Sequence, residues 1–278
     1  MQKNIRSSER IAKVIARSGL ASRREAERLI ECQRVSVNGK KISSPALNVR
    51  KTDQIKVDDN IIGTPAFPRL WLFHKPSGLI STTKDEQGRK TIFDALPTNF
   101  PHVLNVGRLD LNSEGLLLLT NDGDIKRHLE LPSTGWLRRY RVRVKGQPTE
   151  KLIAPLRTGI TLGGERFRPM EITIDRQQSA NAWLTVSLRE GKNREIRRAM
   201  EHIGLKVNRL IRISYGPFQL GTLKVGTVEE VRQKVMRNQL ELDTVKKKRG
   251  KKEISKRKHV KKSFTKTTST VHYLDKNL

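Results

Sequence analysis

The chain has 278 residues, and its 57 lysines and arginines against 28 aspartates and glutamates give a formal net charge of +29. Its longest strongly apolar run, residues 116–119, is far shorter than the roughly 20 residues that span a bilayer, so we expect no membrane span. The charge excess favours a polyanionic partner, with nucleic acid first. A single cysteine excludes an internal disulfide, and the histidines do not pair at metal-ligand spacing, so we expect no metal site. The first residues interleave charges with aliphatics and lack the apolar core of a signal peptide, which predicts a cytoplasmic protein.

Residues 8–63 are predicted to form a small domain of helices packed on a hairpin sheet. Apolar residues in 11–15 recur at helical spacing, and Ser22 with Glu25 forms a capping box that starts a second helix. Alternating valines then lead to Asn38-Gly39, a strong signal for a two-residue hairpin turn.

The polar surface of this amino-terminal unit is predicted to carry a basic patch that binds RNA. An evenly solvated charged face is the alternative interpretation, but the unit is net cationic and adjoins other basic segments. The candidate RNA-binding residues are Arg10, Lys13, Arg23, Arg24, Arg34 and Lys40.

The stretch RIAKVIARSGLASRREAERLIECQRVSVNGK resembles the S4 RNA-binding domain. Gln33 departs from the family pattern, which usually has glycine there, so we expect local backbone strain at that residue. Residues 64–69 contain two prolines and are predicted to be a linker.

Residues 70–240 are predicted to form an α+β domain centred on a sheet. In RRYRVRVKG, Tyr140 and two valines alternate with arginines, so one strand face enters the core while four cations point the other way. The segments LWLFHK, HVLNV, LLLLT, RRYRVRVKG and AWLTVSL favour strands, whereas TIFDAL, TEKLIAPL and NREIRRAMEHIG favour helices. In the last of these, Asn193 is the expected N-cap. The sequence has no P-loop and no dinucleotide fingerprint, so ATP and NAD are not implied.

The segment NVGRLDLNSEGLLLLTNDGD, residues 105–124, is a polar loop between apolar strands and allows three interpretations. A calcium loop starting at Asp110 lacks the glutamate needed at its twelfth position, which is Asn121. A plain turn, in which Asp110 and Asn112 bond their own backbone, is the second. The third is a catalytic carboxylate at Asp110.

The motif GRLD followed by SEGLLLLTNDG resembles the surroundings of the catalytic aspartate in pseudouridine synthases of the RsuA-type small family, which carry an amino-terminal S4 domain. Further matches run from HKPSGLISTTKDEQGRKTIFDALP to LREGKNREIRRAMEHIGLKVNRLIRISYGPF and are most similar to the RluB subgroup. The resemblance implies a catalytic domain with a central, mostly antiparallel mixed sheet. It also implies isomerisation of one uridine in ribosomal RNA, of the large subunit (23S) rather than the small, by a monomeric enzyme without cofactor or metal.

The resemblance also assigns site residues. Asp110 supplies the carboxylate, Tyr140 stacks on the target base, and Arg197 pairs with Asp110, as its place on the shoulder of a helical apolar stripe allows. Arg108 is the candidate for filling the gap left by a flipped nucleotide, with a surface arginine paired to Glu114 as the alternative. Leu210 would lie beneath the tyrosine. From pattern alone Tyr140 and Leu210 are equally typical of a core.

Residues 246–278 are lysine-rich and aperiodic, which predicts a disordered tail. Such a tail is either a non-specific phosphate-binding arm or a solubilising extension. Two other functions remain open at this point. One is a non-catalytic RNA-binding or ribosome-assembly protein, and the other is a DNA binder that uses the two amino-terminal helices as a helix-turn-helix.

Overall fold

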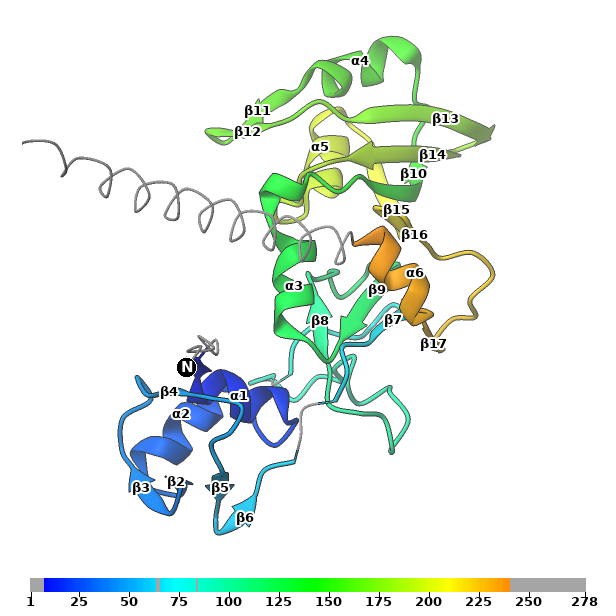
Figure 1. Ribbon diagram of the computed structural model, residues 1–278. Helices are drawn as coiled ribbons and strands as arrows, with labels where there is room; N and C mark the ends of the chain where they lie inside the picture. Colours follow the sequence, from blue (N-terminus) through cyan, green and yellow to red (C-terminus); the bar gives the residue numbers. More distant parts are fainter. Residues whose placement is uncertain (1–7, 64–65, 84, 241–278) are drawn as a thin grey trace, which may run out of the picture. The chain divides into compact units, whose positions relative to one another are not determined.

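The computed structural model describes residues 8–63, 66–83 and 85–240 (Figure 1). The chain divides into two compact units after Glu230. The predicted tail, 246–278, lies outside the described residues, as does part of the predicted linker, 64–69. No helix among the described residues is long and apolar enough to cross a membrane.

The amino-terminal domain consists of two helices and short strands, as predicted. The Ser22 side chain accepts a hydrogen bond from the N–H of Glu25 at 3.2 Å, which starts the second helix. The hairpin turns at Asn38-Gly39, and Gln33 has a positive φ of 55°, the strained conformation expected where glycine is missing. The elements are β1 (Glu9–Arg10), α1 (Ile11–Arg17), α2 (Arg23–Glu31), β2 (Val35–Val37), β3 (Lys40–Ile42), β4 (Asn48–Val49), β5 (Ile55–Val57) and β6 (Asn60–Ile61).

The strands β3-β2-β5-β6 form an antiparallel sheet, and β1 pairs with β4. A separate hydrophobic core joins α1, α2 and this sheet, with Ile11, Ile15, Ile30 and Val35 fully buried. Burial of such aliphatic side chains supplies most of the driving force that holds the helices on the sheet.

The larger part of the chain is built on a nine-stranded sheet, whose main path runs β13-β14-β10-β15-β9-β7-β17. Every strand pair in it is antiparallel except β9 with β15, which confirms the predicted α+β fold with a mostly antiparallel mixed sheet. Its strands are β7 (Leu70–Lys75), β8 (Leu104–Val106), β9 (Glu114–Thr120), β10 (Arg138–Lys145), β13 (Glu171–Gln178), β14 (Asn181–Leu188), β15 (Lys206–Tyr215), β16 (Phe218–Gln219) and β17 (Val228–Glu230). The remaining elements are α3 (Gly123–Glu130), a 3₁₀ turn (Pro132–Thr134), α4 (Glu150–Thr158), β11 (Ile160–Leu162), β12 (Glu165–Phe167) and α5 (Glu195–His202), with α6 (Gln233–Gln239) in the second unit.

The parallel pair in this sheet depends on a glycine. Gly115 has φ of +100° in β9, and a Cβ on it would overlap the backbone of Arg212 in β15. Only glycine therefore allows the strand that follows the Asp110 loop to approach β15 so closely.

Helices α4 and α5 pack on the sheet face that carries Tyr140, Val142 and Val144. These side chains join Leu156 of α4 and Met200 of α5 in one hydrophobic cluster. The odd-numbered residues of β10, which point the other way, are exposed, in agreement with the predicted alternation.

Two local expectations are wrong. The TIFDAL segment forms turns, because the Asp94 carboxylate accepts hydrogen bonds from the N–H and hydroxyl of Thr91 and Pro97 stops any further helical turn. Asn193 is not the N-cap of α5. That position belongs to Arg194, which has a left-handed φ of 49° and no capping side chain.

Candidate active site

The loop that carries Asp110, residues 107–113, connects β8 to β9. Side chains from several elements form hydrogen bonds with its backbone. Glu130 accepts from the Gly107 N–H at 2.7 Å, and the Ser81 hydroxyl donates to the Leu109 carbonyl at 2.9 Å. Asn105 donates to the Gly107 carbonyl at 2.6 Å. These bonds come from elements on both sides of the loop and fix its path.

Lys75 is the central support of this loop, and sequence reasoning gave it no role. Its side chain is fully buried at the end of β7, and Nζ donates to the carbonyls of Asp110 at 3.2 Å, Leu111 at 3.3 Å and Ser113 at 2.9 Å. A fourth bond goes to Pro76 at 3.0 Å. Burial lowers the pKa of Lys75 to about 8, although the charges of Asp110 and Glu114 oppose this shift.

The Asp110 side chain borders two adjoining cavities. The smaller, of about 200 Å³, is lined by Asp110, Tyr140 and Leu210 together with residues of β15 and of the segment before α5. Tyr140 is 8% exposed, so its ring belongs to the core cluster and to the cavity wall at once. Arg108 also lines this cavity, so the structure brings together four of the predicted site residues.

Arg197 supports the loop in a different way from the one predicted. Its guanidinium donates to the carbonyl of Asn112 at 2.8 Å and to that of Val207 at 3.2 Å, and in the described part of the chain it forms no ion pair with Asp110. Burial and the neighbouring Arg194 lower the pKa of Arg197, while the charge of Asp110 opposes this. The loop turns the Asn112 carbonyl toward α5, where the guanidinium of Arg197 reaches it.

The larger cavity, of about 680 Å³, is rimmed by cations that extend beyond the Asp110 loop. Two of them are neutralised within the protein, since Arg89 pairs with Asp85 and Lys126 with Glu130, both at 2.7 Å. The exposed Arg108 and Arg194 also line it. Glu114, the alternative partner considered for Arg108, pairs instead with Arg209 at 2.7 Å.

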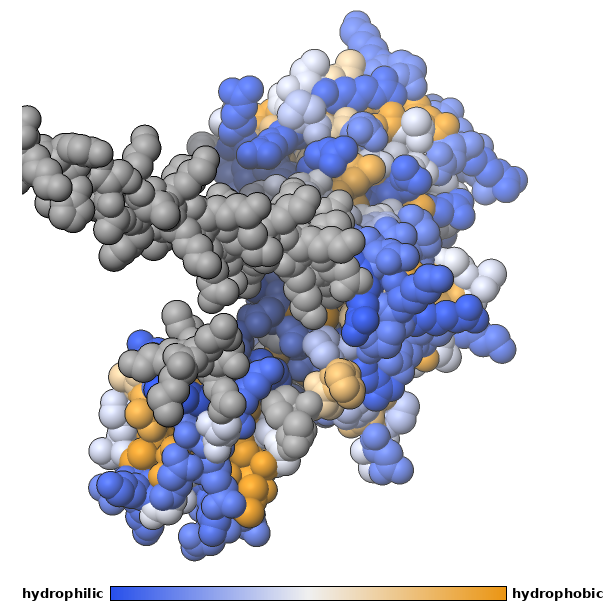
Figure 2. Space-filling view, in the orientation of Figure 1, coloured by the Kyte–Doolittle hydropathy of each residue, from blue (hydrophilic) through white to orange (hydrophobic). Residues whose placement is uncertain are grey.

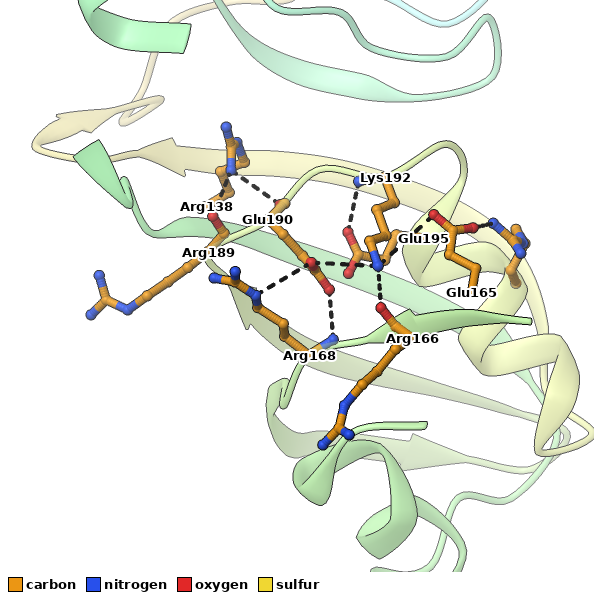
Figure 3. A network of polar contacts seen from close by, with 9 residues as sticks. Arg138, Glu165, Arg166, Arg168, Arg189, Glu190, Lys192 and Glu195 are labelled. Carbon is orange, nitrogen blue, oxygen red and sulfur yellow. Dashed lines mark hydrogen bonds and ion pairs between the residues drawn. The ribbon is translucent and has the colours of Figure 1, made fainter. Parts of the chain in front are cut away.

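The segment between β14 and α5 forms the far wall of the smaller cavity and is held by a polar network (Figure 3). Arg138 donates to the carbonyls of Arg189 and Glu190 at 3.2 and 3.1 Å. The Lys192 N–H donates to Glu195 Oε2 at 2.9 Å. Burial, with the adjacent Glu190 carboxylate, raises the pKa of Glu195 to about 8.

Away from the cavities, the surface of the larger domain is mostly hydrophilic in the view of Figure 2. On β10, Arg139, Arg141, Arg143 and Lys145 are exposed, and Arg141 stacks over Trp183 at 4.9 Å. In the amino-terminal domain, Arg10, Arg23, Arg24, Arg34 and Lys40 are exposed and Lys13 is half-buried. Arg34 is paired with Asp58 at 2.5 Å and Lys13 with Glu9 at 3.3 Å.

The calcium interpretation of the loop finds no support. Glu114 is engaged by Arg209, and the described residues contain no group of three or more His, Cys, Asp or Glu side chains placed to hold a metal ion.

These features define a class of protein: an S4 domain followed by a sheet on which a loop, fixed by side-chain hydrogen bonds, presents one aspartate to a small cavity beside a tyrosine. A profile of the S4 domain matches residues 9–55, and a profile of the RNA pseudouridylate synthase family matches residues 69–202. The chain belongs to the RNA pseudouridylate synthase family and is an isomerase that acts on RNA.

The relatives agree with this assignment. An RNA pseudouridine synthase of Rickettsia conorii is 47% identical over 229 residues, which cover 82% of this chain and 99% of that protein. Ribosomal large subunit pseudouridine synthase B of Salmonella typhi is 40% identical over 220 residues, covering 77% of this chain and 75% of the relative. A crystal structure of a pseudouridylate synthase shares the fold with a TM-score of 0.60 at 24% identity, over 83% of this chain and 99% of that one.

Proposed function

We propose that the protein converts one uridine of large-subunit ribosomal RNA to pseudouridine, with the carboxylate of Asp110 as the group that acts on the nucleoside. The observation that carries this proposal is the Asp110 loop itself. A carboxylate on a backbone fixed by Lys75, Ser81 and Arg197 is held beside a buried tyrosine at the wall of a small cavity. Such preorganisation is what a site needs when it must act on one atom of a bound nucleoside.

The reaction breaks the bond between N1 of uracil and C1′ of ribose, rotates the base and joins C5 to C1′. The hydrogen on C5 leaves as a proton and N1 gains one, so the reaction balances without oxidant, reductant or energy source. In this site Asp110 acts on the nucleoside, and the Tyr140 ring packs against the base. Leu210 packs in the same wall, and Arg197 holds Asp110 in position through the Asn112 carbonyl.

A uridine inside an RNA helix must leave the stack to reach this cavity, at a cost of a few kcal/mol. Arg108 is exposed at the border of both cavities, two residues from Asp110, and fills the space that the nucleotide vacates. Arg194 and Lys192 at the same rim contact the flanking phosphates. The S4 domain and the exposed arginines of β10 add contacts to the RNA backbone.

The choice of large-subunit ribosomal RNA rests on the 40% identical relative named for that substrate. The test is pseudouridine mapping of ribosomal RNA from cells that lack this protein, complemented with the natural gene or with Asp110→Asn. We expect one large-subunit site to disappear and to return only with the natural gene. Loss at a small-subunit or transfer RNA site would overturn the substrate assignment, and a site restored by Asp110→Asn would overturn the role of Asp110.

A further inference from the structure

The strands β13, β14 and β10, which lie side by side in Figure 1, have a second face opposite the one that carries Tyr140, and we call it the outer face. A row of exposed cations on β10 follows it: Arg139, Arg141, Arg143 and Lys145. Because alternate residues of a strand lie about 6.8 Å apart, the row is about 20 Å long. Within the described residues, none of the four forms an ion pair, whereas Arg157 and Arg198 are paired with glutamates at 2.6 Å.

The pairing of β10 with β15 places like charges directly opposite each other on this face. Arg143 lies opposite Arg209, and Lys145 lies opposite Lys206. Like charges in that position destabilise a sheet. Arg209 is neutralised by Glu114 at 2.7 Å, but Lys145 and Lys206 are both exposed and have no acidic partner in the described part of the chain. Such an arrangement is relieved when an anion binds to the face.

Strand β14 adds an aromatic ring to the row of cations. Trp183 is half-buried and lies directly opposite Arg143, and the guanidinium of Arg141 stacks over its ring at 4.9 Å. Arg141 is still exposed, so the stacked pair presents a cationic surface to the solvent. Unpaired nucleobases stack on aromatic rings and on guanidinium planes. A cationic path with a stacking platform is typical of surfaces that bind single-stranded nucleic acid.

The acidic residues of the outer face lie at its margin, on the edge strand β13. The carboxylate of Asp175 accepts a hydrogen bond from the Thr185 hydroxyl at 2.8 Å, so it is held within the protein. Glu171 lies two strands away from the row on β10. Arg176 of the same edge strand is exposed and lies opposite Trp183, which extends the positive charge across the sheet. The charge of the face therefore complements a polyanion.

We propose that the outer face binds a single-stranded segment of the substrate RNA, separate from the segment that carries the target uridine. Tyr140 and the cation row lie on opposite faces of one strand, so the thickness of the sheet separates a nucleotide in the cavity from one on the row. A different part of the RNA must therefore reach the outer face. The assignment rests on the proposed function for the identity of that RNA, and it adds an unpaired second segment to the substrate.

The test uses the full-length protein and three RNAs. They are an unmodified transcript of large-subunit ribosomal RNA, a hairpin cut from it around the modified uridine, and polycytidylate, which is single-stranded and contains no uridine. One variant combines Arg143→Gln with Lys145→Gln, and another, Trp183→Leu, removes the ring. The matched control combines Lys151→Gln with Lys224→Gln, which removes the same charge from exposed positions in α4 and in the loop after β16.

The double variant of β10 should raise the Kd for polycytidylate roughly tenfold and reduce the slope of log K against log salt by about 1.4, which corresponds to two phosphates. Its melting temperature should stay unchanged or rise, because the opposed like charges are removed. Polycytidylate should quench the tryptophan fluorescence of the natural protein, and Trp183→Leu should lose most of this quenching. The control should change the Kd less than about twofold.

Isomerisation is followed as release of tritium from C5 of the labelled target. On the transcript, kcat/KM of the double variant of β10 should fall roughly tenfold with kcat unchanged, because the cavity is untouched and only binding is weakened. On the hairpin, which lacks the second segment, both kcat and kcat/KM should stay within about twofold of the natural values.

The outcomes separate the failure of this assignment from that of the proposed function. Polycytidylate binding and quenching that stay unchanged in the variants would overturn the assignment, and an acidic protein segment would then be the occupant that fits the charge. Equal losses on the hairpin and the transcript would show that the face contacts the target segment itself. A control that loses as much affinity as the double variant of β10 would reduce the effect to net charge. A natural protein that modifies no uridine of the transcript, with polycytidylate binding still lost in the variant, would overturn the proposed substrate and leave the outer face as an RNA-binding surface.

Discussion

In the Asp110 loop, side chains from β7, β8, α3 and α5 bond the backbone of five of the seven residues, and most of these bonds are buried or half-buried. On the amino-terminal domain, Arg23, Arg24 and Lys40 instead lie exposed at the surface. The contrast agrees with the roles that we propose for the two regions. Acting on one atom of a nucleoside needs a fixed position, whereas attraction of a phosphate backbone needs positive charge at low conformational cost.

Removal of the Asp110 carboxylate, with the cationic surfaces left intact, tests whether the two regions act separately. Asp110→Asn should abolish isomerisation in single-turnover assays while the Kd for the RNA changes less than about tenfold, because phosphate contacts supply most of the affinity. Binding is measured by filter retention or anisotropy at fixed salt. Loss of binding in parallel with activity would mean that the loop and the surfaces are not separate in function.

The second prediction concerns the support of the loop. Lys75→Met removes the donor shared by four carbonyls and should lower the free energy of unfolding by about 2 kcal/mol, with kcat reduced roughly a hundredfold through misplacement of Asp110. Chemical denaturation and steady-state kinetics measure the two effects. Lys151→Met, at an exposed position of α4, is the control and should change neither quantity. A Lys75→Met protein with normal kcat would show that the loop holds its shape without the lysine.

The contrast between local and three-dimensional contacts also explains which parts of the molecule could be predicted from the sequence. Strands with strict alternation and the Asn38-Gly39 hairpin were predicted correctly, because period-two patterns and turn motifs are local signals. That Asp110 and Tyr140 line one cavity was implied only by the family resemblance, because their proximity is not a local property. The partners of Arg197 were not predicted, since a bond to the Asn112 carbonyl depends on a path fixed only in three dimensions.

Some buried charged residues to which the sequence analysis gave no role could have been found from strand alternation. Lys75 shares strand parity with Trp71 and Phe73, both buried, and Arg212 shares it with Leu210. A charged residue on the apolar face of a strand must be bonded or functional, so both positions were open to inference from alternation alone. Glu195 left no comparable signal, because its environment is made by a segment with a left-handed residue, Arg194, rather than by regular helix.

A third prediction concerns the pH dependence of the free energy of unfolding, which depends on Glu195 beside the smaller cavity. Folding raises the pKa of Glu195 from its ordinary 4.5 to about 8, so the native state binds one proton more than the unfolded chain between those values. The free energy of unfolding should therefore fall as pH rises from about 5 to 8, by at most about 1.4 kcal/mol per pH unit. Glu190 and Lys192 are the charged groups beside it and act in opposite directions.

Glu195→Gln cannot titrate, so its denaturation profile should be flatter than that of the natural protein over the same range. Lys75 is present in both proteins, and its pKa of about 8 affects stability mainly above that pH, where unfolding takes up a proton and stability rises. The difference between the two profiles thus isolates Glu195. Parallel profiles from pH 5 to 8 would contradict the raised pKa.

The smallest expected effect lies on the amino-terminal surface, where exposed charges act nearly independently. Arg24→Ala with Lys40→Ala should weaken RNA binding only several-fold at moderate salt and reduce the slope of log K against log salt by about 0.7 for each phosphate that is no longer neutralised. Arg34→Ala is the matched control, because its guanidinium is already paired with Asp58 at 2.5 Å and releases few counterions on binding. If Arg34→Ala changes the slope as much as each unpaired residue does, the ion pair opens on the RNA, and pairing in the free protein does not decide which cations of this domain bind phosphate.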